Sequence, residues 1–232
     1  LDVMRARASG AKVMGVVKAN AYGHGAIPVA KTLERAGVDY LGVADVHEAL
    51  ELREAGIHAP ILAWLHDPAD NFEAALSQNV DLGVANLDQL ERITKAAAIT
   101  GEVAKLHLKI DTGLGRNGAT AGDWVSLLEA VKDLGEAVVV VGIFSHLSTT
   151  SREDDLAQIE KFDSAVADVK RLGIAFELRH LTASDGSLAY PDAHYEMVRI
   201  GVALYGLDPF SSNKAAEYGL IPAMTAVSKV SQ

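Results

Sequence analysis

Residues 13–44 read VMGVVKANAYGHGAIPVAKTLERAGVDYLGVA and predict one complete strand–helix–strand unit. The run Val13–Lys18 is apolar up to its final lysine, as is typical of a parallel strand that is buried on both faces. Gly25–Ala36 has a helical pattern, with Pro28 tolerated in its first turn. Tyr40–Ala44 is the next apolar run. The segment therefore predicts a parallel α/β fold.

The same alternation repeats along the chain. The predicted strands are the runs rich in Val, Ile and Leu: Val13–Lys18, Tyr40–Ala44, Pro60–Leu65, Asp81–Ala85, Lys105–Ile110, Val138–Phe144, Phe176–Thr182 and Met197–Tyr205. Helices are predicted between them: Gly25–Ala36, Val46–Ala55, Asp70–Gln78, Leu87–Thr100, Asp123–Leu134, Glu153–Leu172 and the short Asp185–Leu188. Strands with one helical connection each predict a (β/α)8 TIM-type barrel, and an open doubly wound sheet is the alternative.

The length of 232 residues is within the range of a single α/β barrel. No linker, low-complexity tract or block of charge divides the chain. The stretch Ala223–Val230 is predicted to be one more strand, for which a barrel closed by eight strands has no place. We therefore expect residues 1–219 to form the barrel domain. Residues 220–232 would be the start of a C-terminal β-domain, before which the chain is truncated.

The composition excludes several classes of function. The chain contains no cysteine, so it has no disulfides, thiolate metal sites or cysteine nucleophile. Its 21 Lys and Arg against 31 Asp and Glu give a net charge of −10, which disfavours nucleic acid and anionic lipid as partners. The longest apolar run, Ala137–Phe144, is far shorter than the roughly 20 residues that span a bilayer. Because no signal-peptide pattern is present either, we expect a cytoplasmic protein.

In barrels of this kind, catalytic groups collect at the carboxyl ends of the strands. Lys18 closes the first predicted strand, among apolar residues that would lower the pKa of its amine and favour the neutral form. A neutral amine is a nucleophile that forms a Schiff base with an aldehyde. A lysine that simply reaches solvent from a strand end is the alternative interpretation.

Two residues at later strand ends predict a phosphate site. Ser184 follows the seventh strand and Gly201 lies in the eighth, where barrels commonly bind phosphate. Backbone N–H groups and a hydroxyl can hold phosphate oxygens, although a glycine there is often only a turn residue. A Schiff-base lysine together with a phosphate site indicates pyridoxal 5'-phosphate (PLP). A Schiff-base aldolase is the other candidate, but its lysine usually lies on a later strand.

Four motifs carry a resemblance to a known family. Val16–Gly25, which reads VVKANAYGHG, is similar to the PLP-lysine signature of bacterial alanine racemases. Lys109–Arg116 resembles the family's strand-five motif, with Leu114 where Met is common. Ser145–Leu147 and Met197–Gly206 resemble its strand-six and strand-eight motifs. The motifs occur in the family's order and span almost the whole chain.

The resemblance implies a fold-type III enzyme, with a PLP-binding barrel followed by a β-rich domain, that acts as a homodimer. The implied activity is an isomerisation that interconverts L-alanine and D-alanine by proton transfer at Cα. Its product would supply D-alanine for the peptidoglycan precursors of the cell wall. Lys18 would hold PLP as a Schiff base and then act as the base for the D-enantiomer.

The resemblance also implies roles for the other residues of the site. His146 would pack against the pyridine ring. Arg116 would lie near the cofactor phenolate and the substrate carboxylate. Lys109 matches a lysine that some members carry as a carbamate. The contacts of the cofactor phosphate would be made by Tyr22, Ser184, Gly201 and Val202.

Arg199 would hydrogen-bond the pyridine nitrogen. A guanidinium stays charged and has no acceptor, so it can only donate to an unprotonated nitrogen. An unprotonated ring withdraws electrons less strongly than a pyridinium does. This difference would suppress transamination and favour prompt reprotonation at Cα.

The chain departs from the family pattern in two respects. Ala183 stands where an asparagine commonly precedes Ser184, which removes one polar side chain near the phosphate. Racemisation also needs a base on the opposite face of Cα. In the family this base is a tyrosine of the β-domain of the other subunit, which Tyr195, Tyr205 and Tyr218 do not match. We therefore expect this chain by itself to bind PLP weakly and to racemise poorly or not at all.

Alternatives remain open beside the alanine racemase. A racemase of another small amino acid, such as serine, would have the same barrel. A non-catalytic PLP-binding barrel is a second alternative, which the extra strand predicted at Ala223–Val230 disfavours. A metal-dependent hydrolase would need clustered histidines and aspartates at the strand ends, and the sequence shows no such spacing, so we predict no metal site.

Overall fold

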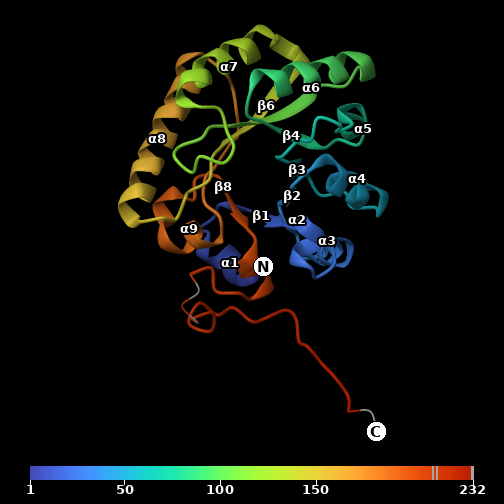
Figure 1. Cartoon of the computed structure of the whole chain (residues 1–232), viewed down its shortest axis with the longest axis vertical. Coiled ribbons are helices and arrows are strands. Elements are labelled where there is room, and N and C mark those ends of the chain that lie inside the picture. The colour runs from blue at the N-terminus through green and yellow to red at the C-terminus, as the bar shows by residue number, and fades with distance from the viewer. Residues whose placement is uncertain (211, 213, 231–232) are drawn as a thin grey trace.

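The computed structural model describes residues 1–210, 212 and 214–230 (Figure 1). The strands are β1 Lys12–Val16, β2 Tyr40–Val43, β3 Ile61–Ala63, β4 Asp81–Val84, β5 Ala104–Lys109, β6 Val138–Phe144, β7 Leu178–His180 and β8 Met197–Ile200. The α-helices are α1 Asp2–Arg7, α2 Lys18–Tyr22, α3 Ala26–Arg35, α4 Val46–Glu54, α5 Phe72–Ser77, α6 Leu87–Thr100, α7 Ala121–Asp133, α8 Arg152–Arg171 and α9 Ser184–Ala189. Short 3-10 turns are η1 Gly135–Ala137, η2 Pro191–Ala193 and η3 Val202–Tyr205.

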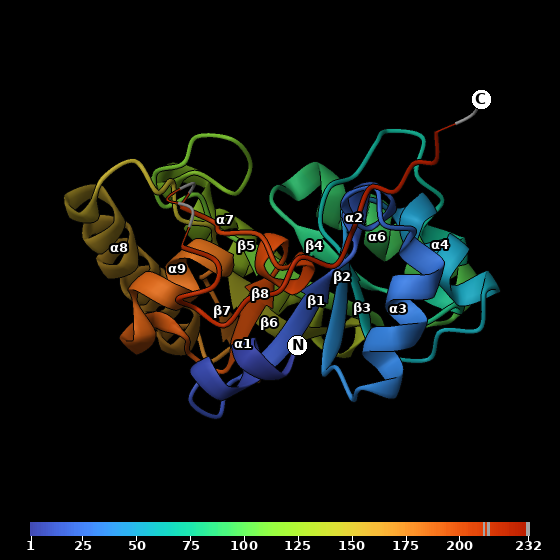
Figure 2. The ribbon, with the colours of Figure 1, turned by 90° about the horizontal axis from the view of Figure 1, so that it is seen from below.

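The strands form one sheet in the order β7-β6-β5-β4-β3-β2-β1-β8. Strand β1 pairs in parallel with both β2 and β8, which brings the last strand beside the first. Between β8 and β7, the backbone N–H of Arg199 donates to the carbonyl of Thr182 at 3.0 Å, so the ring of strands is nearly closed. The helices surround the strands, as Figure 1 and the view at right angles in Figure 2 show. The predicted (β/α)8 barrel is confirmed, and the open doubly wound sheet is wrong.

Alternate residues of the strands build two buried regions. One face of the strands packs against the helices, where Leu41, Leu82 and Leu106 are fully buried. Residues of the other face meet in a separate cluster, to which β7 and β8, at opposite ends of the strand order, both contribute: Met14, Tyr40, Leu62, Leu178 and Met197. Only a rolled-up sheet can bring these strands together, so this cluster fills the barrel interior.

The predicted helices begin and end within two residues of their expected bounds. Side chains of N-cap residues explain several of the starts, since each accepts a hydrogen bond from a backbone N–H three residues further on. These N-caps are Asp45, Asn71, Asn86, Thr120 and Ser151. In the part of the chain that the structure describes, no helix combines the length and the apolar character needed to cross a membrane.

The predicted strand Met197–Tyr205 is too long. Strand β8 ends at Ile200, and the turn η3 follows after Gly201, whose φ of −106° and ψ of −98° belong to neither a strand nor a helix. The apolar run continues past the strand because the turn is itself buried through Ala203 and Tyr205. Hydrophobicity alone could not separate the two elements.

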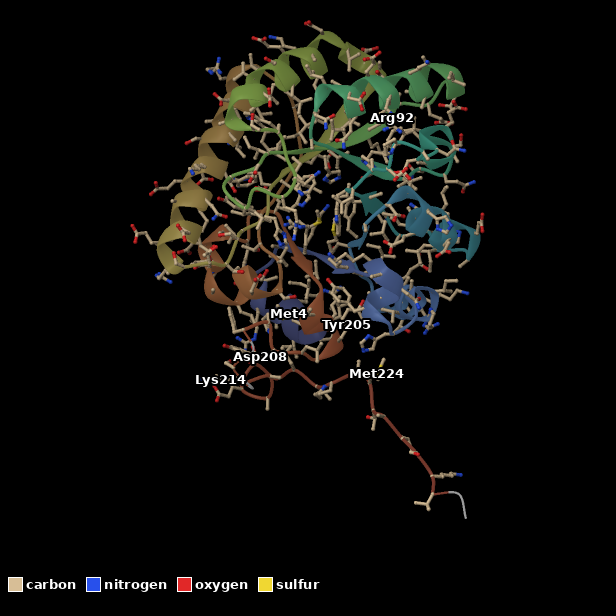
Figure 3. The ribbon with its side chains drawn as sticks, in the orientation of Figure 1. Met4, Arg92, Tyr205, Asp208, Lys214 and Met224 are labelled. Carbon is tan, nitrogen blue, oxygen red and sulfur yellow. The ribbon has the colours of Figure 1, made fainter. Side chains whose placement is uncertain are left out.

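The predicted strand Ala223–Val230 is wrong. This segment has no strand pairing, and Val227 and Val230 are 84% and 97% exposed. Its first residue donates a backbone hydrogen bond to the carbonyl of Tyr205, and the segment then leaves the barrel past Met224 (Figure 3). A strand requires a neighbour that pairs its N–H and C=O groups, and no described residue supplies one here. The domain boundary at residue 219 stays a prediction.

Candidate active site

The carboxyl ends of the strands surround a cavity of about 220 Å³. It brings together every residue that the sequence analysis assigned to a site: Lys18, Tyr22, Lys109, Arg116, His146, Ser184, Arg199, Gly201 and Val202. Ala183 also lines the cavity, and no side-chain bond caps the helix that follows it. The sequence analysis missed five lining residues: Val16, Trp64, Phe144, Asp185 and Pro209. Trp64 directly follows β3 and Phe144 ends β6. Their positions at the ends of strands could therefore have identified both as lining residues.

Lys18 lies beyond β1, which ends at Val16, and it begins the turn α2. The next residues, Ala19 to Tyr22, have φ angles between +50° and +54°. Four successive residues therefore form a left-handed turn, a conformation that costs non-glycine residues roughly 1–2 kcal/mol each. Such a turn persists only where surrounding contacts fix it.

Side-chain oxygens hold this left-handed turn by accepting hydrogen bonds from backbone N–H groups. One carboxylate oxygen of Glu48 accepts from the backbone N–H of Ala19 at 2.5 Å, and the other accepts from that of Ala44 at 2.7 Å. The side-chain oxygen of Asn20 accepts from the backbone N–H of Ala26 at 2.7 Å. The turn is thus tied to both α4 and α3, which fixes the position from which Lys18 enters the cavity.

The surroundings of Lys18 favour its neutral form. Burial lowers the pKa of its ammonium below the usual value, and the positive charge of Arg116 lowers that pKa further. Glu48 acts in the opposite direction, with a smaller effect. The lowered pKa predicted for Lys18 is confirmed, and it increases the fraction of amine that can act as a nucleophile or a base.

Ser184 and Gly201 meet at one end of the cavity. The hydroxyl oxygen of Ser184 accepts hydrogen bonds from the backbone N–H groups of Gly201 at 3.1 Å and Ala203 at 3.3 Å. Because its oxygen accepts from these two N–H groups, the Ser184 hydroxyl is fixed in place and can donate its own proton to an anion in the cavity. Val202, between them, also lines the cavity.

Gly201 leaves room for Tyr22. A β-carbon at position 201 would overlap the hydroxyl oxygen of Tyr22, so this approach requires glycine. Tyr205, labelled in Figure 3, packs behind Tyr22 with ring centroids 5.2 Å apart, and its own hydroxyl donates to the carbonyl of Val16 at 2.9 Å. His24 stacks on Tyr205 at 4.5 Å. The Tyr22 hydroxyl is therefore held beside the Ser184–Gly201 donors.

Arg199 is buried and held by backbone carbonyls. Its Nη1 donates to the carbonyl of His180 at 2.6 Å, and its Nη2 donates to those of Ser145 at 2.7 Å and Leu181 at 2.9 Å. Nδ1 of His146 also lies 3.2 Å from Nη2. Nε makes no hydrogen bond to any described residue, so its N–H is available to a group in the cavity.

Basic side chains, two of which are arginines, dominate one wall of the cavity. Burial, Arg199 and Arg116 lower the pKa of Lys109 to about 7. Burial and the charge of Arg199 lower the pKa of His146 to about 3, which keeps its imidazole neutral at neutral pH. Lys18 and Arg116 complete the group. A cavity with this charge favours an anionic ligand.

Comparison with known proteins gives one consistent result. The chain matches the family described as alanine racemase, N-terminal domain, over residues 1–209. The alanine racemase of Salinispora tropica is 42% identical over 232 residues, which cover 96% of this chain and 60% of that protein. The alanine racemase of Thermobifida fusca is 40% identical over 230 residues, covering 97% of this chain and 61% of that protein.

Solved structures agree with the sequence comparisons. Alanine racemase from D-cycloserine-producing Streptomyces lavendulae superposes with a TM-score of 0.91 at 38% identity, covering 95% of this chain and 59% of that one. Alanine racemase from Bacillus anthracis with bound L-Ala-P superposes with a TM-score of 0.81 at 29% identity, covering 96% and 60%. This chain thus spans about 60% of the length of the relatives that it matches.

Proposed function

Because this chain belongs to the family of alanine racemase N-terminal domains, we propose that it is the PLP-binding barrel of an enzyme that interconverts L-alanine and D-alanine. One observation carries the proposal. A lysine with a lowered pKa and a set of anion-binding donors line the same cavity, at the ends of strands β1, β7 and β8. This is the pair of features that a phosphate-bearing aldehyde requires.

The residues of the cavity fit PLP. Its phosphate needs several donors, and the Ser184 hydroxyl, whose oxygen accepts from the backbone N–H of Gly201, meets the Tyr22 hydroxyl at one end. Its ring nitrogen needs a single donor, which Nε of Arg199 offers. Its aldehyde needs an amine, which Lys18 supplies. We propose that these residues, with Val202 at the phosphate and His146 against the ring, hold the cofactor.

When bound, PLP supplies an electron sink for the negative charge that develops at Cα of an amino acid. Nζ of Lys18 takes and returns the Cα proton on one face, because its lowered pKa keeps part of the amine neutral. Arg116 binds the substrate carboxylate. Arg199 would donate to the ring nitrogen of the bound cofactor without protonating it, since a guanidinium retains its proton.

We propose that Lys109 reacts with carbon dioxide. Its amine is buried and partly neutral at neutral pH, and the positive charges of Arg199 and Arg116 both lower its pKa. In the reaction, the amine nitrogen bonds to the carbon of CO₂ and loses one proton to solvent, which yields a carbamate anion. The product would replace a cation that the arginines disfavour with an anion that they attract.

The base on the second face of Cα lies outside this cavity in our proposal. Tyr22 is the single described tyrosine that lines the cavity, and it belongs to the phosphate end. We propose that the base comes from another subunit of a homodimer, and that the enzyme supplies D-alanine for peptidoglycan in the cytoplasm. Serine is not favoured as the substrate, because the relatives are named alanine racemase.

A titration with PLP tests the proposal. We expect a visible absorbance band that saturates, and after borohydride reduction and peptide mapping a label on Lys18. The variant Lys18→Ala should lose both the band and the label, whereas Lys105→Ala, which removes an exposed lysine of β5, should keep them. Equal labelling in the Lys18→Ala variant would contradict the assignment of the cofactor site.

A further inference from the structure

A chain of buried polar side chains crosses the barrel interior behind Arg199. Nη1 of Arg199 on β8 lies 3.1 Å from Nδ1 of His180 on β7, and Nε2 of His180 lies 2.8 Å from Nδ1 of His107 on β5. Nε2 of His107 lies 3.4 Å from Oδ2 of Asp81 on β4, which also accepts from the hydroxyl of Tyr40 on β2 at 3.0 Å. All five side chains are buried.

The two ends of this row of side chains determine the direction in which protons are donated along it. A guanidinium only donates, so Nδ1 of His180 must be an unprotonated acceptor. The proton of His180 is then on Nε2 and is donated to Nδ1 of His107. The proton of His107 is in turn on Nε2 and is donated to the carboxylate of Asp81. Both histidines are thus neutral and carry their proton on Nε2.

The sheet is built to admit these contacts. The pairing of β5 with β6 shifts register between Leu106 and His107, so that β6 carries one extra residue at this level. The shift places Gly142 of β6 opposite His107. A β-carbon on Gly142 would lie 2.5 Å from Nδ1 of His107 and 3.2 Å from Nε2 of His180. A bulge therefore aims these side chains, and a glycine makes space for their hydrogen bond.

Among the residues that the structure describes, no carboxylate lies within hydrogen-bonding distance of Arg199, so the negative end of this row of side chains is Asp81. Phe144 supports the arrangement by stacking on His180, with ring centroids 4.8 Å apart and planes 8° from parallel. Because Nη1 and Nη2 are both occupied inside the protein, the guanidinium can present only Nε–H to the cavity. Rotation of the guanidinium would break the bond to His180.

We propose that His180, His107 and Asp81 are positioning residues for Arg199, which keep Nδ1 of His180 a fixed acceptor and so hold Nε–H toward the cavity. The consequence for the cofactor rests on the proposed function, because Nε–H would be the donor to the ring nitrogen. The positioning of Arg199 itself is a property of this chain without any ligand, and it can be tested separately.

The first test is ¹⁵N NMR of the histidine side chains in the unliganded chain. We expect His180 and His107 to carry their proton on Nε2 at neutral pH. The signals can be assigned from those lost in the variant His107→Gln. A proton on Nδ1 of either ring, or on both nitrogens of either ring, would overturn the inference without the need for any variant.

The second test compares His107→Gln with His107→Leu. The glutamine can accept from His180 and donate to Asp81, whereas the leucine of similar size can do neither. The readout is the rotation rate of the Arg199 guanidinium, measured by ¹⁵N NMR exchange of its two Nη groups. We expect the guanidinium to rotate about tenfold faster in the leucine variant, which corresponds to a rotation barrier lower by about 1.4 kcal/mol. In the glutamine variant the rotation rate should be near that of the wild type. Unchanged rotation in the leucine variant would overturn the positioning role.

Circular dichroism establishes that each variant folds. If His107→Leu does not, Asp81→Asn replaces it, because an amide oxygen is a weaker acceptor than the carboxylate and should hold Nε2–H of His107 less firmly. Unchanged Arg199 rotation in Asp81→Asn would contradict the inference there.

Binding of PLP supplies the last readout. We expect weaker binding for the leucine variant than for the glutamine variant. If the wild-type chain binds no PLP, the proposed function fails, while the tautomers and the Arg199 rotation still decide whether this chain of residues positions Arg199.

Discussion

The carboxylate of Glu48 accepts a hydrogen bond at 2.5 Å from the backbone N–H of Ala19, the residue directly after Lys18. Glu48 lies in the first turn of α4, where its own N–H donates to the N-cap Asp45 at 2.9 Å. Its side chain does not complete the capping of its own helix, but reaches the left-handed turn α2 and the end of β2. One helix thus fixes the conformation of the neighbouring βα connection.

Loss of Glu48 should release this turn. We expect Glu48→Ala to lower the free energy of unfolding by about 1–3 kcal/mol, because two backbone N–H groups lose a charged acceptor. It should also slow the attachment of PLP to Lys18. Glu51→Ala is the matched control, since Glu51 is an exposed acid of the same helix. Urea denaturation measures both variants, and equal stability of the two would contradict the role of Glu48.

The pKa of Lys18 should respond in opposite directions to its two charged neighbours. After ¹³C-methylation of the amine, an NMR titration should give a pKa below the ordinary 10.5. Arg116→Gln should raise that pKa, because a like charge is removed, and Glu48→Gln should lower it, because an opposite charge is removed. An unchanged pKa in both variants would show that burial alone controls the amine, and shifts of the same sign would contradict the assigned charge effects.

Lys109 should make the stability of the chain depend on pH. Its folded pKa of about 7 lies below the ordinary 10.5, so between these values the unfolded chain binds more protons. The free energy of unfolding should therefore rise with pH across this window, by at most roughly 1.4 kcal/mol per pH unit from this residue.

Lys109→Met should flatten this rise and stabilise the chain most below pH 7, where the folded state holds a buried charge. Lys105→Met, on the exposed start of β5, should leave the slope unchanged. Urea denaturation at several pH values in CO₂-free buffer measures the slope, since CO₂ would convert the amine to a carbamate. A parallel slope in Lys109→Met would contradict the expectation.

Gly201→Ala should disrupt the phosphate end of the cavity. The added methyl group overlaps the Tyr22 hydroxyl, so the variant should lose about 1–3 kcal/mol of stability and bind PLP more weakly. Gly122→Ala is the control, because the nearest atom to its new β-carbon is 3.7 Å away and the position is helical. Thermal unfolding and PLP titration should separate the two alanine variants.

Ala183→Asn should strengthen the site. Ala183 is the N-cap of α9 and offers no side-chain acceptor, whereas an asparagine there could accept from a backbone N–H of the first turn. We expect a gain of about 0.5–2 kcal/mol in the free energy of unfolding. Ala183→Leu, which also enlarges the side chain but has no acceptor, should show no gain. An equal effect of both variants would show that packing, not capping, is responsible.

Short-range patterns were enough to predict the barrel. Continuous apolar runs mark strands that are covered on both faces, and capping residues such as Asp45 and Asn86 mark the starts of helices between them. Prediction from short-range patterns fails at two segments, Met197–Tyr205 and Ala223–Val230. In the first, a buried turn has the hydrophobicity of a strand. In the second, the strand pattern has no partner among the described residues.

Part of the candidate site also followed from the sequence. Lys18, Ser184 and Gly201 were predicted because a barrel gathers the ends of its strands at one face. The other predicted members came from the family resemblance, and five lining residues were missed. The conformation of the site did not follow from the sequence. Residues 19–22 contain no glycine, and nothing local predicts a left-handed turn there. That turn depends on Glu48, which is 29 residues away from Ala19 along the chain.

The sequence by itself determined the order of strands and helices, the lysine and the anion-binding residues, since these depend on periodicity and on side-chain chemistry. Only the tertiary structure decided how they are held. The left-handed turn before the cavity and the Arg199–His180–His107–Asp81 contacts are made between elements far apart in the chain. The geometry of hydrogen bonds between distant elements depends on register and on a bulge in β6, which no local propensity encodes.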